Sequence, residues 1–118
     1  MTEQYPFTGL PSIDKDVMQP LKELLGDNFY ELMDEFFDNF PRTFATLKTA
    51  SSNVDANEIM QVAHTLKSSS GSFGFTCLFK YLEHLELQAR KEHIINFANQ
   101  VELIETEFNK ITKLVKRN

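Results

Sequence analysis

The chain has 118 residues, of which 42% are hydrophobic, and it carries a formal net charge of −5. This length is enough for one domain with a buried core. The acidic balance disfavours nucleic acid as a partner, because phosphate backbones bind to basic surfaces. Cys77 is the single cysteine, so no intramolecular disulfide forms. The chain shows no signal-like or membrane-length apolar run, and we expect a cytoplasmic protein that does not engage a membrane.

The beginning of the chain predicts a tail followed by a short helix. Pro6, Gly9 and Pro11 lie within residues 1–11, which we interpret as an N-terminal tail whose aromatic residues can dock on the body. Residues 12–118 then form the predicted helical domain. Pro20 predicts a first helix that is either kinked or short, beginning near Gln19.

The second helix has the strongest apolar periodicity in the chain. Its predicted inner face consists of Phe29, Met33, Phe36, Phe37, Phe40, Phe44 and Leu47. Gly26 ends the preceding helix, and Asp27 is a candidate N-cap. The apolar pattern continues in phase past Pro41, which predicts one kinked helix rather than two. Ser51–Val54 is the predicted loop that follows.

Three further helices complete the prediction. Asp55 and Glu58 have the spacing of a capping box at the start of the third helix, and Gly74 ends it. A turn near Lys91–Glu92 separates the fourth helix from the fifth. The inner faces of the three helices are Ile59, Val62, Ala63, Leu66 and Phe73; Leu78, Tyr81, Leu82, Leu85 and Ala89; and Phe97, Val101, Ile104, Phe108, Ile111 and Val115. The sequence therefore predicts an all-α fold, an antiparallel up-down four-helix bundle with an additional short N-terminal helix.

His64 is the most informative residue of the chain. At about 100° per residue it falls roughly 140° from the centre of the apolar stripe, so its ring is predicted to stand in water. Lys67 follows one turn later, and residues 68–72 are all serine or glycine, so no bulky side chain crowds the ring. A nucleophile that titrates near neutral pH beside a cation suits the acceptance of a phosphoryl group. The alternative interpretation is an ordinary solvated histidine.

A carboxylate is predicted to face that ring. His64 precedes Gly74 by ten residues and Glu86 follows it by twelve, so an antiparallel hairpin brings the two to nearly the same height. Glu86 falls about 80° from its own apolar stripe, at the boundary between core and water. There it can accept a hydrogen bond from the imidazole, fix the tautomer and stabilise positive charge on the ring, or else serve only as a boundary carboxylate.

No motif indicates a resident metal or cofactor. The three histidines and Cys77 lack the paired spacing of zinc ligands, and no Glu-x-x-His pair of a di-metal bundle occurs. A glycine-rich nucleotide loop is lacking too, so the sequence predicts no ATP site of its own.

The chain resembles the histidine-containing phosphotransfer (HPt) domains of two-component phosphorelays. The resemblance is carried by Ala63-His64-Thr65-Leu66-Lys67, by the serines and Gly74 that follow, and by Leu82-Glu83-His84-Leu85-Glu86, and it covers roughly residues 13–116. It implies that His64 is the phospho-acceptor, that Lys67 neutralises the phosphoryl oxygens, and that Glu86 stands where the family places a Gln or Glu that hydrogen-bonds the imidazole. Ser68 departs from the glycine that most often follows the motif lysine in the family.

The resemblance implies a phosphocarrier rather than an enzyme. Receiver domains of hybrid sensor kinases and response regulators are the implied partners, and they bring the phospho-aspartate and the Mg²⁺. We expect a monomer whose phosphoryl- and partner-docking residues include Met60, Ser68, Gly71 and Gly74. The alternative is a helical-bundle adapter that binds a signalling partner without phosphotransfer.

Overall fold

The computed structural model describes residues 5–92 and 96–115. It contains five α-helices over these ranges and no strand, so the all-α prediction is confirmed. The helices are α1 (Lys15–Leu25), α2 (Asn28–Ser52), α3 (Ala56–Ser72), α4 (Thr76–Arg90) and α5 (Phe97–Leu114). Within the described residues, none of these helices combines the length and apolar character needed to cross a membrane.

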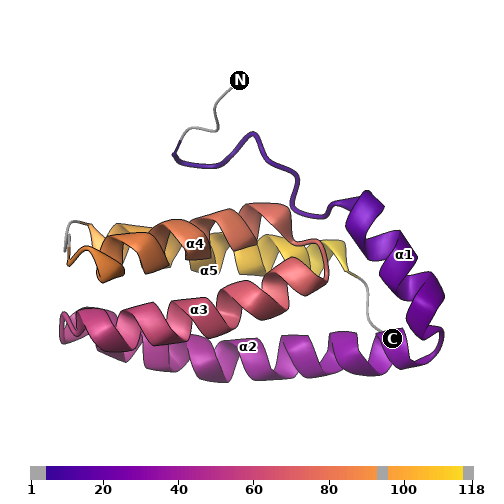
Figure 1. The fold of residues 1–118 in the computed structure, drawn as a ribbon, viewed down its shortest axis with the longest axis horizontal. Coiled ribbons are helices and arrows are strands. Elements are labelled where there is room, and N and C mark those ends of the chain that lie inside the picture. Colours follow the sequence, from indigo (N-terminus) through magenta and orange to yellow (C-terminus); the bar gives the residue numbers. More distant parts are fainter. Residues whose placement is uncertain (1–4, 93–95, 116–118) are drawn as a thin grey trace.

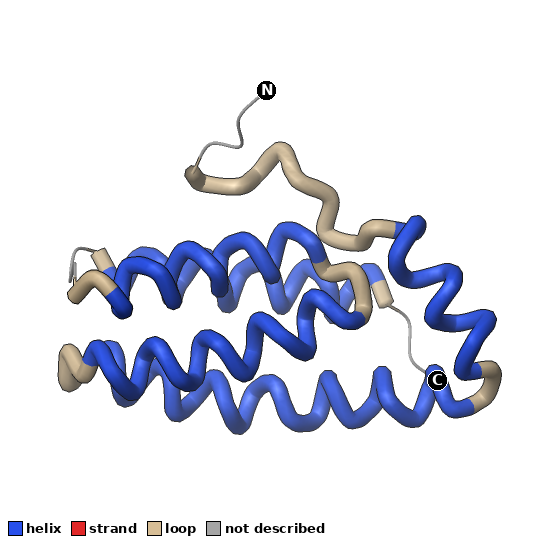
Figure 2. The backbone as a smooth tube through the Cα atoms, viewed as in Figure 1, coloured by secondary structure: helices blue, strands red, loops and turns tan. Residues whose placement is uncertain are grey.

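Helices α2 to α5 lie side by side, and successive helices run in opposite directions (Figure 1). Helix α3 packs against both α2 and α4, while α5 contacts α4 and α2. Helix α1 contacts α2 and lies across the end of the long helices where α2 begins (Figure 1). Short connections join α2 to α3 and α3 to α4 (Figure 2), so the helices that carry the site are held in a tight hairpin.

The core is rich in phenylalanine, as the periodicity predicts. All seven predicted inner residues of α2 are buried, and so are the predicted inner residues of α3 and α4. Phe40 and Phe108 stack across α2 and α5, with ring centroids 4.1 Å apart. Leu24 of α1 lies outside the core and is 81% exposed. Helix α1 lies at the edge of the bundle and buries none of its residues completely.

Helix α1 begins earlier than the short-helix prediction has it. Its first residue is Lys15 rather than one near Gln19, and Pro20 lies inside it. The side chain of Asp14 accepts a hydrogen bond from the backbone N–H of Asp16 at 3.0 Å. This cap satisfies a donor at the first turn, and Pro20 removes only one later backbone bond, so the helix forms around it.

Helix α2 is one helix through Pro41, as predicted, but its ends differ from the prediction. Asp27 stands at the N-cap position without a side-chain capping bond. The predicted loop over residues 51–54 begins too early, because α2 continues to Ser52. Val54 then adopts a φ of 54°. In this turn the N–H of Val54 donates to the carbonyl of Ser51, and the N–H of Asp55 donates to the carbonyl of Ala50. These bonds extend the helix by satisfying its last carbonyls.

Only half of the predicted capping box forms at α3. The side chain of Asp55 accepts from the backbone N–H of Glu58 at 3.1 Å. The N–H of Asp55, which the box would pair with the Glu58 carboxylate, donates instead to the carbonyl of Ala50 at 3.0 Å. The end of α2 therefore takes the donor that the Glu58 side chain was expected to satisfy.

Two glycines allow close packing around the turn between α3 and α4, Gly74 against the start of α1 and Gly71 against α4. Gly74 has a φ of +82°, and a Cβ there would lie 2.8 Å from the backbone oxygen of Asp14. A Cβ at Gly71 would lie 2.9 Å from the ring of Phe79 on α4. Gly74 is buried, and its carbonyl accepts from the N–H of Asp14 at 2.7 Å. The start of α1 lies against Gly74, and the docking role of Gly74 stays a prediction.

The N-terminal segment is docked on α4 over its described part, residues 5–11. Tyr5 stacks on the ring of His84 with centroids 4.5 Å apart. The thiol of Cys77 donates to the carbonyl of Phe7 at 3.1 Å, and the N–H of Cys77 donates to Pro11 at 3.1 Å. Burial, followed by the nearby carboxylate of Glu107, raises the pKa of Cys77 to about 12, so this thiol stays protonated and inert.

Candidate functional site

The ring of His64 projects outward from α3, and the edge of the ring that carries Nδ1 faces α4. Its side chain is 60% exposed, and Nδ1 lies 3.0 Å from Oε2 of Glu86. Both geometric predictions, the exposed ring and the carboxylate at the same height across the hairpin, are confirmed. The geometry leaves Nε2 as the ring nitrogen that is not bound to the carboxylate.

Glu86 is more buried than its position on α4 predicts. The residue is 3% exposed, so it lies inside the bundle surface rather than at the boundary with water. Three side chains from two helices surround its carboxylate. Lys67 Nζ lies 2.8 Å from Oε1, while His64 Nδ1 and Arg90 Nη2 lie 3.0 and 2.9 Å from Oε2. A buried carboxylate requires such compensation, because its desolvation is costly.

These donors keep Glu86 ionised. Burial alone raises the pKa of the Glu86 carboxyl, but the hydrogen bonds from Lys67 and then His64 outweigh it, so the net pKa lies below its usual value. A carboxylate only accepts hydrogen bonds, so the contact with a neutral His64 ring requires the proton on Nδ1. The Nε2 lone pair then faces outward, available to attack an electrophile.

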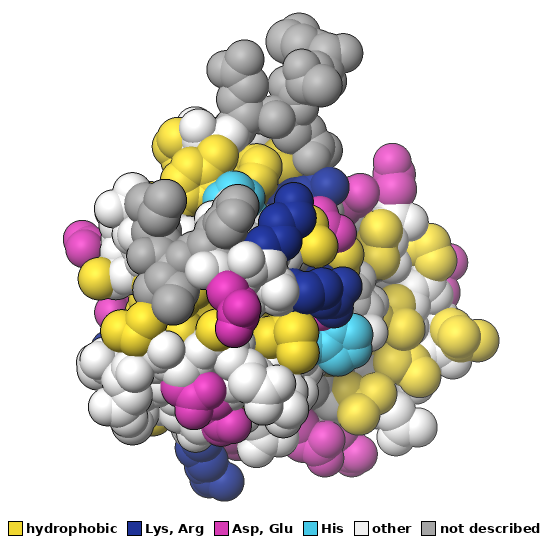
Figure 3. Space-filling model, turned by 60° about the vertical axis from the view of Figure 1, so that its left-hand side comes forward, with side chains coloured by type: hydrophobic (Ala, Val, Ile, Leu, Met, Phe, Trp, Pro, Cys, Tyr) yellow, Lys and Arg dark blue, Asp and Glu magenta, His cyan; other side chains and the backbone are white. Residues whose placement is uncertain are grey.

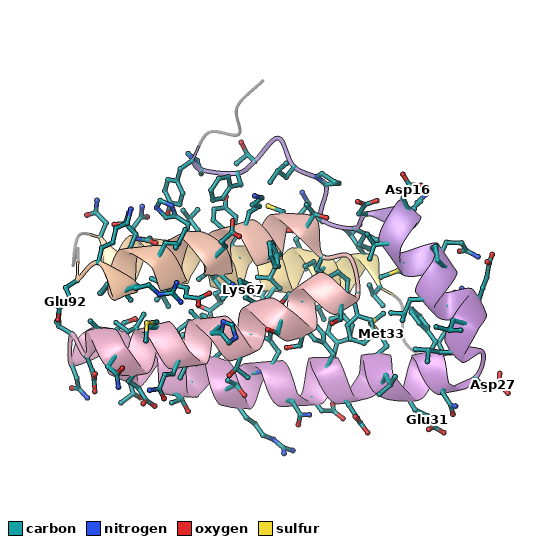
Figure 4. All side chains as sticks on the ribbon, viewed as in Figure 1. Asp16, Asp27, Glu31, Met33, Lys67 and Glu92 are labelled. Carbon is teal, nitrogen blue, oxygen red and sulfur yellow. The ribbon has the colours of Figure 1, made fainter. Side chains whose placement is uncertain are left out.

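Lys67 is held by the hairpin rather than extended into solvent. Its side chain is 20% exposed, and its ammonium also lies over the ring of Phe79, 5.9 Å from the centroid. Figure 4 shows Lys67 at the junction of α3 and α4. The role implied by the resemblance, contact with phosphoryl oxygens, therefore requires Lys67 to share or leave its contact with Glu86.

Arg90 is the site residue that the sequence analysis missed. Its side chain is 58% exposed and bonds to the same Glu86 oxygen that His64 contacts. A signal for it was present, since Arg90 follows Glu86 by four residues and an acidic residue four before a basic one pairs on a helix.

A shallow hollow opens beside the ring. It measures about 330 Å³ and is lined by Met60, Gln61, His64, Glu86 and Arg90. Met60, predicted as a docking residue, is thus brought to the site. Figure 3 shows a histidine ring at the surface beside Lys and Arg side chains, with hydrophobic side chains gathered next to it.

The serines after His64 divide into two kinds. Ser69 and Ser70 donate to backbone carbonyls of their own helix, the latter to Leu66 at 2.8 Å, and Ser70 is completely buried. They are therefore back-bonding serines. Ser68 is exposed one turn after His64, on the same face of α3.

A larger apolar groove borders the histidine face. It measures about 610 Å³ and lies between α1, α2 and α3. Exposed or half-buried leucines from α1 and α2 form one side, and Thr65, Ser69 and Ser72 of α3 form the other; the leucines are Leu21, Leu25 and Leu32. In the part of the chain that the structure describes, no group of three or more potential ligands is arranged to hold a metal ion.

Comparison with known proteins agrees with this site. The Hpt domain family matches residues 31–113, which is most of the chain. The chain belongs to the Hpt domain family. Its structure is similar to the crystal structure of histidine-containing phosphotransfer protein B (HptB) from Pseudomonas aeruginosa PAO1, with a TM-score of 0.85 and 28% identity over 88% of this chain and 90% of that one. No curated protein gave a significant match.

As an Hpt domain protein, the chain is a histidine phosphotransfer intermediate of a two-component phosphorelay and works with receiver domains. The match begins within α2, so the docked N-terminal segment and α1 lie outside it. Helix α1 nevertheless supplies one wall of the apolar groove beside His64. Residues before the region matched by the family model therefore shape the surface next to His64.

Proposed function

We propose that His64 is the residue that accepts a phosphoryl group from the aspartate of one receiver domain and passes it to the aspartate of another. The single observation that carries this proposal is a ring that is 60% exposed and held through Nδ1, at 3.0 Å, by a buried carboxylate. The other described histidine, His84, is packed against Tyr5 and Phe7 and has no such partner arrangement.

The transfer step follows from this geometry. Nε2 of the neutral ring attacks the phosphorus in line, the N–P bond forms, and the bond to the aspartate oxygen breaks, leaving a carboxylate on the receiver. The Nδ1 proton stays on the ring, which becomes positively charged against Glu86. Lys67 adds positive charge beside the phosphoryl oxygens. Docking must bring Nε2 to about 3–3.5 Å from phosphorus, which the exposed ring permits.

The proposed protein is a carrier without an ATP site or metal of its own. The receiver supplies the phospho-aspartate and Mg²⁺, while this chain supplies the nucleophile and its orientation. Helices α2 to α5 serve as an up-down four-helix bundle, with α1 as an accessory helix, and hold that orientation rigid. A monomer in the cytoplasm suits a carrier that exchanges one receiver for another.

The receiver docks over His64 and the adjacent groove. Leu32 is 41% exposed on the groove wall, next to the half-buried Leu21 and Leu25 of α1. Exposed apolar area of this kind marks a protein contact site. Because the groove borders the face that must meet the phospho-aspartate, the receiver is the occupant that fits both.

The test is incubation with a phosphorylated receiver domain and Mg²⁺. Wild-type protein should gain a label that is lost in acid and survives base, and His64→Gln should gain none while keeping its helical circular dichroism spectrum. His84→Gln is the matched control and should label like wild type. Labelling of His64→Gln would contradict the assignment. Binding of the receiver by wild-type protein without any label would favour an adapter instead.

A further inference from the structure

Two permanent cations meet one carboxylate at the His64 site. Lys67 Nζ lies 2.8 Å from one oxygen of Glu86, and Arg90 Nη2 lies 2.9 Å from the other. The charge of Lys67 is therefore already balanced before a phosphoryl group arrives. Arg90 supplies the surplus positive charge, and without it the set of side chains around the neutral ring would be electrically neutral.

Arg90 is also the more accessible of the two cations. Its side chain is 58% exposed, against 20% for Lys67, which is further held over the ring of Phe79. The guanidinium of Arg90 lines the hollow beside His64. It has five N–H donors in a fixed fork, which suits two oxygens of one phosphoryl group, and its bond to Glu86 uses only part of that capacity.

We infer that Arg90 is a phosphoryl-binding residue of the transfer reaction, which holds the phosphoryl oxygens while remaining on or near Glu86. This inference rests on the proposed role of His64 and deepens it. In this arrangement Lys67 chiefly keeps Glu86 ionised and in place. Arg90 is the group that meets the charge brought by the partner.

The step needs no further reactant. The phosphoryl group moves from the aspartate oxygen to Nε2 of His64 with its full negative charge, and the receiver keeps the electron pair of the broken bond. The positive charge that appears on the ring is offset by Glu86, 3.0 Å from Nδ1. The ring shares this carboxylate with Lys67 and Arg90, and Arg90, the more exposed of the two permanent cations, meets the negative charge of the phosphoryl oxygens.

The experiment compares single-turnover phosphoryl uptake from a phosphorylated receiver with Mg²⁺ across a range of receiver concentrations. Arg90→Gln should lower the plateau rate by about tenfold or more, in line with the loss of a preorganised donor, while the half-saturating receiver concentration changes by less than about twofold. Arg90→Lys should recover part of the rate. Lys91→Gln removes the same charge from the exposed residue that follows, and should stay within about twofold of wild type.

A second readout reports contact with the phosphoryl group itself. A cation bound to phosphoryl oxygens lowers the pKa of their second ionisation, so Arg90→Gln should raise that pKa in a ³¹P NMR titration of the phosphorylated protein. An unchanged titration, an unchanged plateau rate, or a change in half-saturation alone would overturn the inference. In each of those cases the proposed function is still supported if wild type is labelled and His64→Gln is not. The inference about Arg90 and the proposed role of His64 can therefore be refuted independently.

Discussion

Glu86→Ala is expected to destabilise the fold as well as the site, because three donors lose their acceptor. Loss of the Lys67 contact costs the most stability, since the Lys67 side chain is 20% exposed and its ammonium loses its carboxylate partner. Breaking a buried pair costs about 3–5 kcal/mol, and the flexible stem of Lys67 lets the charge reach water and recovers part of that. His64 and Arg90, at 60% and 58% exposure, contribute little each. We expect a loss of about 2–4 kcal/mol.

This loss is measurable as a shift in Tm. An unfolding entropy of about 2.1 cal/mol/K per residue makes 1 kcal/mol worth about 4 °C for a chain of 118 residues. Glu86→Ala should therefore melt about 8–16 °C lower than wild type. Glu86→Gln keeps one acceptor oxygen, so its Tm should lie between those of wild type and Glu86→Ala. Glu83→Ala is the matched control on the same helix. It breaks only the 3.3 Å pair with Lys80 and should cost under about 1 kcal/mol.

The effect should also depend on pH with a definite sign. The pKa of Glu86 lies below its usual value in the folded protein, with burial opposing the shift and the Lys67 and His64 hydrogen bonds causing it. The stability that the ionised group contributes is therefore complete above the unfolded pKa of about 4.3 and is lost as pH falls through the lower, folded value. Urea unfolding of wild type and Glu86→Ala from about pH 7 to pH 3 should show the gap narrowing only in acid. A gap below about 0.5 kcal/mol at neutral pH, or one that widens in acid, would refute the reasoning.

Three further changes separate transfer, docking and folding. Ser68→Gln places a long side chain one turn from His64 and should slow phosphoryl uptake by about tenfold or more without changing the Tm; an unaltered rate would mean that the site is more open than argued. Leu32→Asp, at a position 41% exposed, should weaken receiver binding by about five- to tenfold in calorimetry while leaving stability within about 1 kcal/mol. Gly74→Ala should cost about 2–4 kcal/mol in chemical unfolding, because φ is +82° and the new Cβ would lie 2.8 Å from a backbone oxygen of Asp14; a loss under about 1 kcal/mol would show that the turn relaxes freely.

The long helices and the meeting of His64 with Glu86 follow from sequence because they depend on local periodicity. Apolar residues at helical spacing fix which face of α3 is buried, and His64 lies opposite it. Counting residues from Gly74 then sets the height of Glu86 on the next helix. Both steps use the geometry of single helices and one short turn, which sequence specifies well.

Contacts between non-neighbouring segments were harder to predict. Glu86 is more buried than its angle from the apolar stripe of α4 predicts, because the side chains of Lys67 and Arg90 cover it from two helices. Residues 5–11 showed no periodicity, yet Cys77 bonds to two of their carbonyls and fixes them on α4. The cap expected from Asp27 failed for a local reason, since its backbone is already helical and its side chain makes no capping bond.

The His64 ring is both exposed and held in place, because its support comes from the side that faces the bundle. A carrier that meets two receivers cannot enclose its histidine, so orientation must come from the protein side alone. Burying the Glu86 carboxylate achieves this, because three donors from α3 and α4 must stay in place to compensate it. Any slide of α3 along α4 would break the contacts of Lys67 and His64 with Glu86, and the close approach of Gly71 to Phe79 leaves little room for one. The contacts that compensate the buried charge therefore include the one that holds the His64 ring with Nδ1 inward and Nε2 outward.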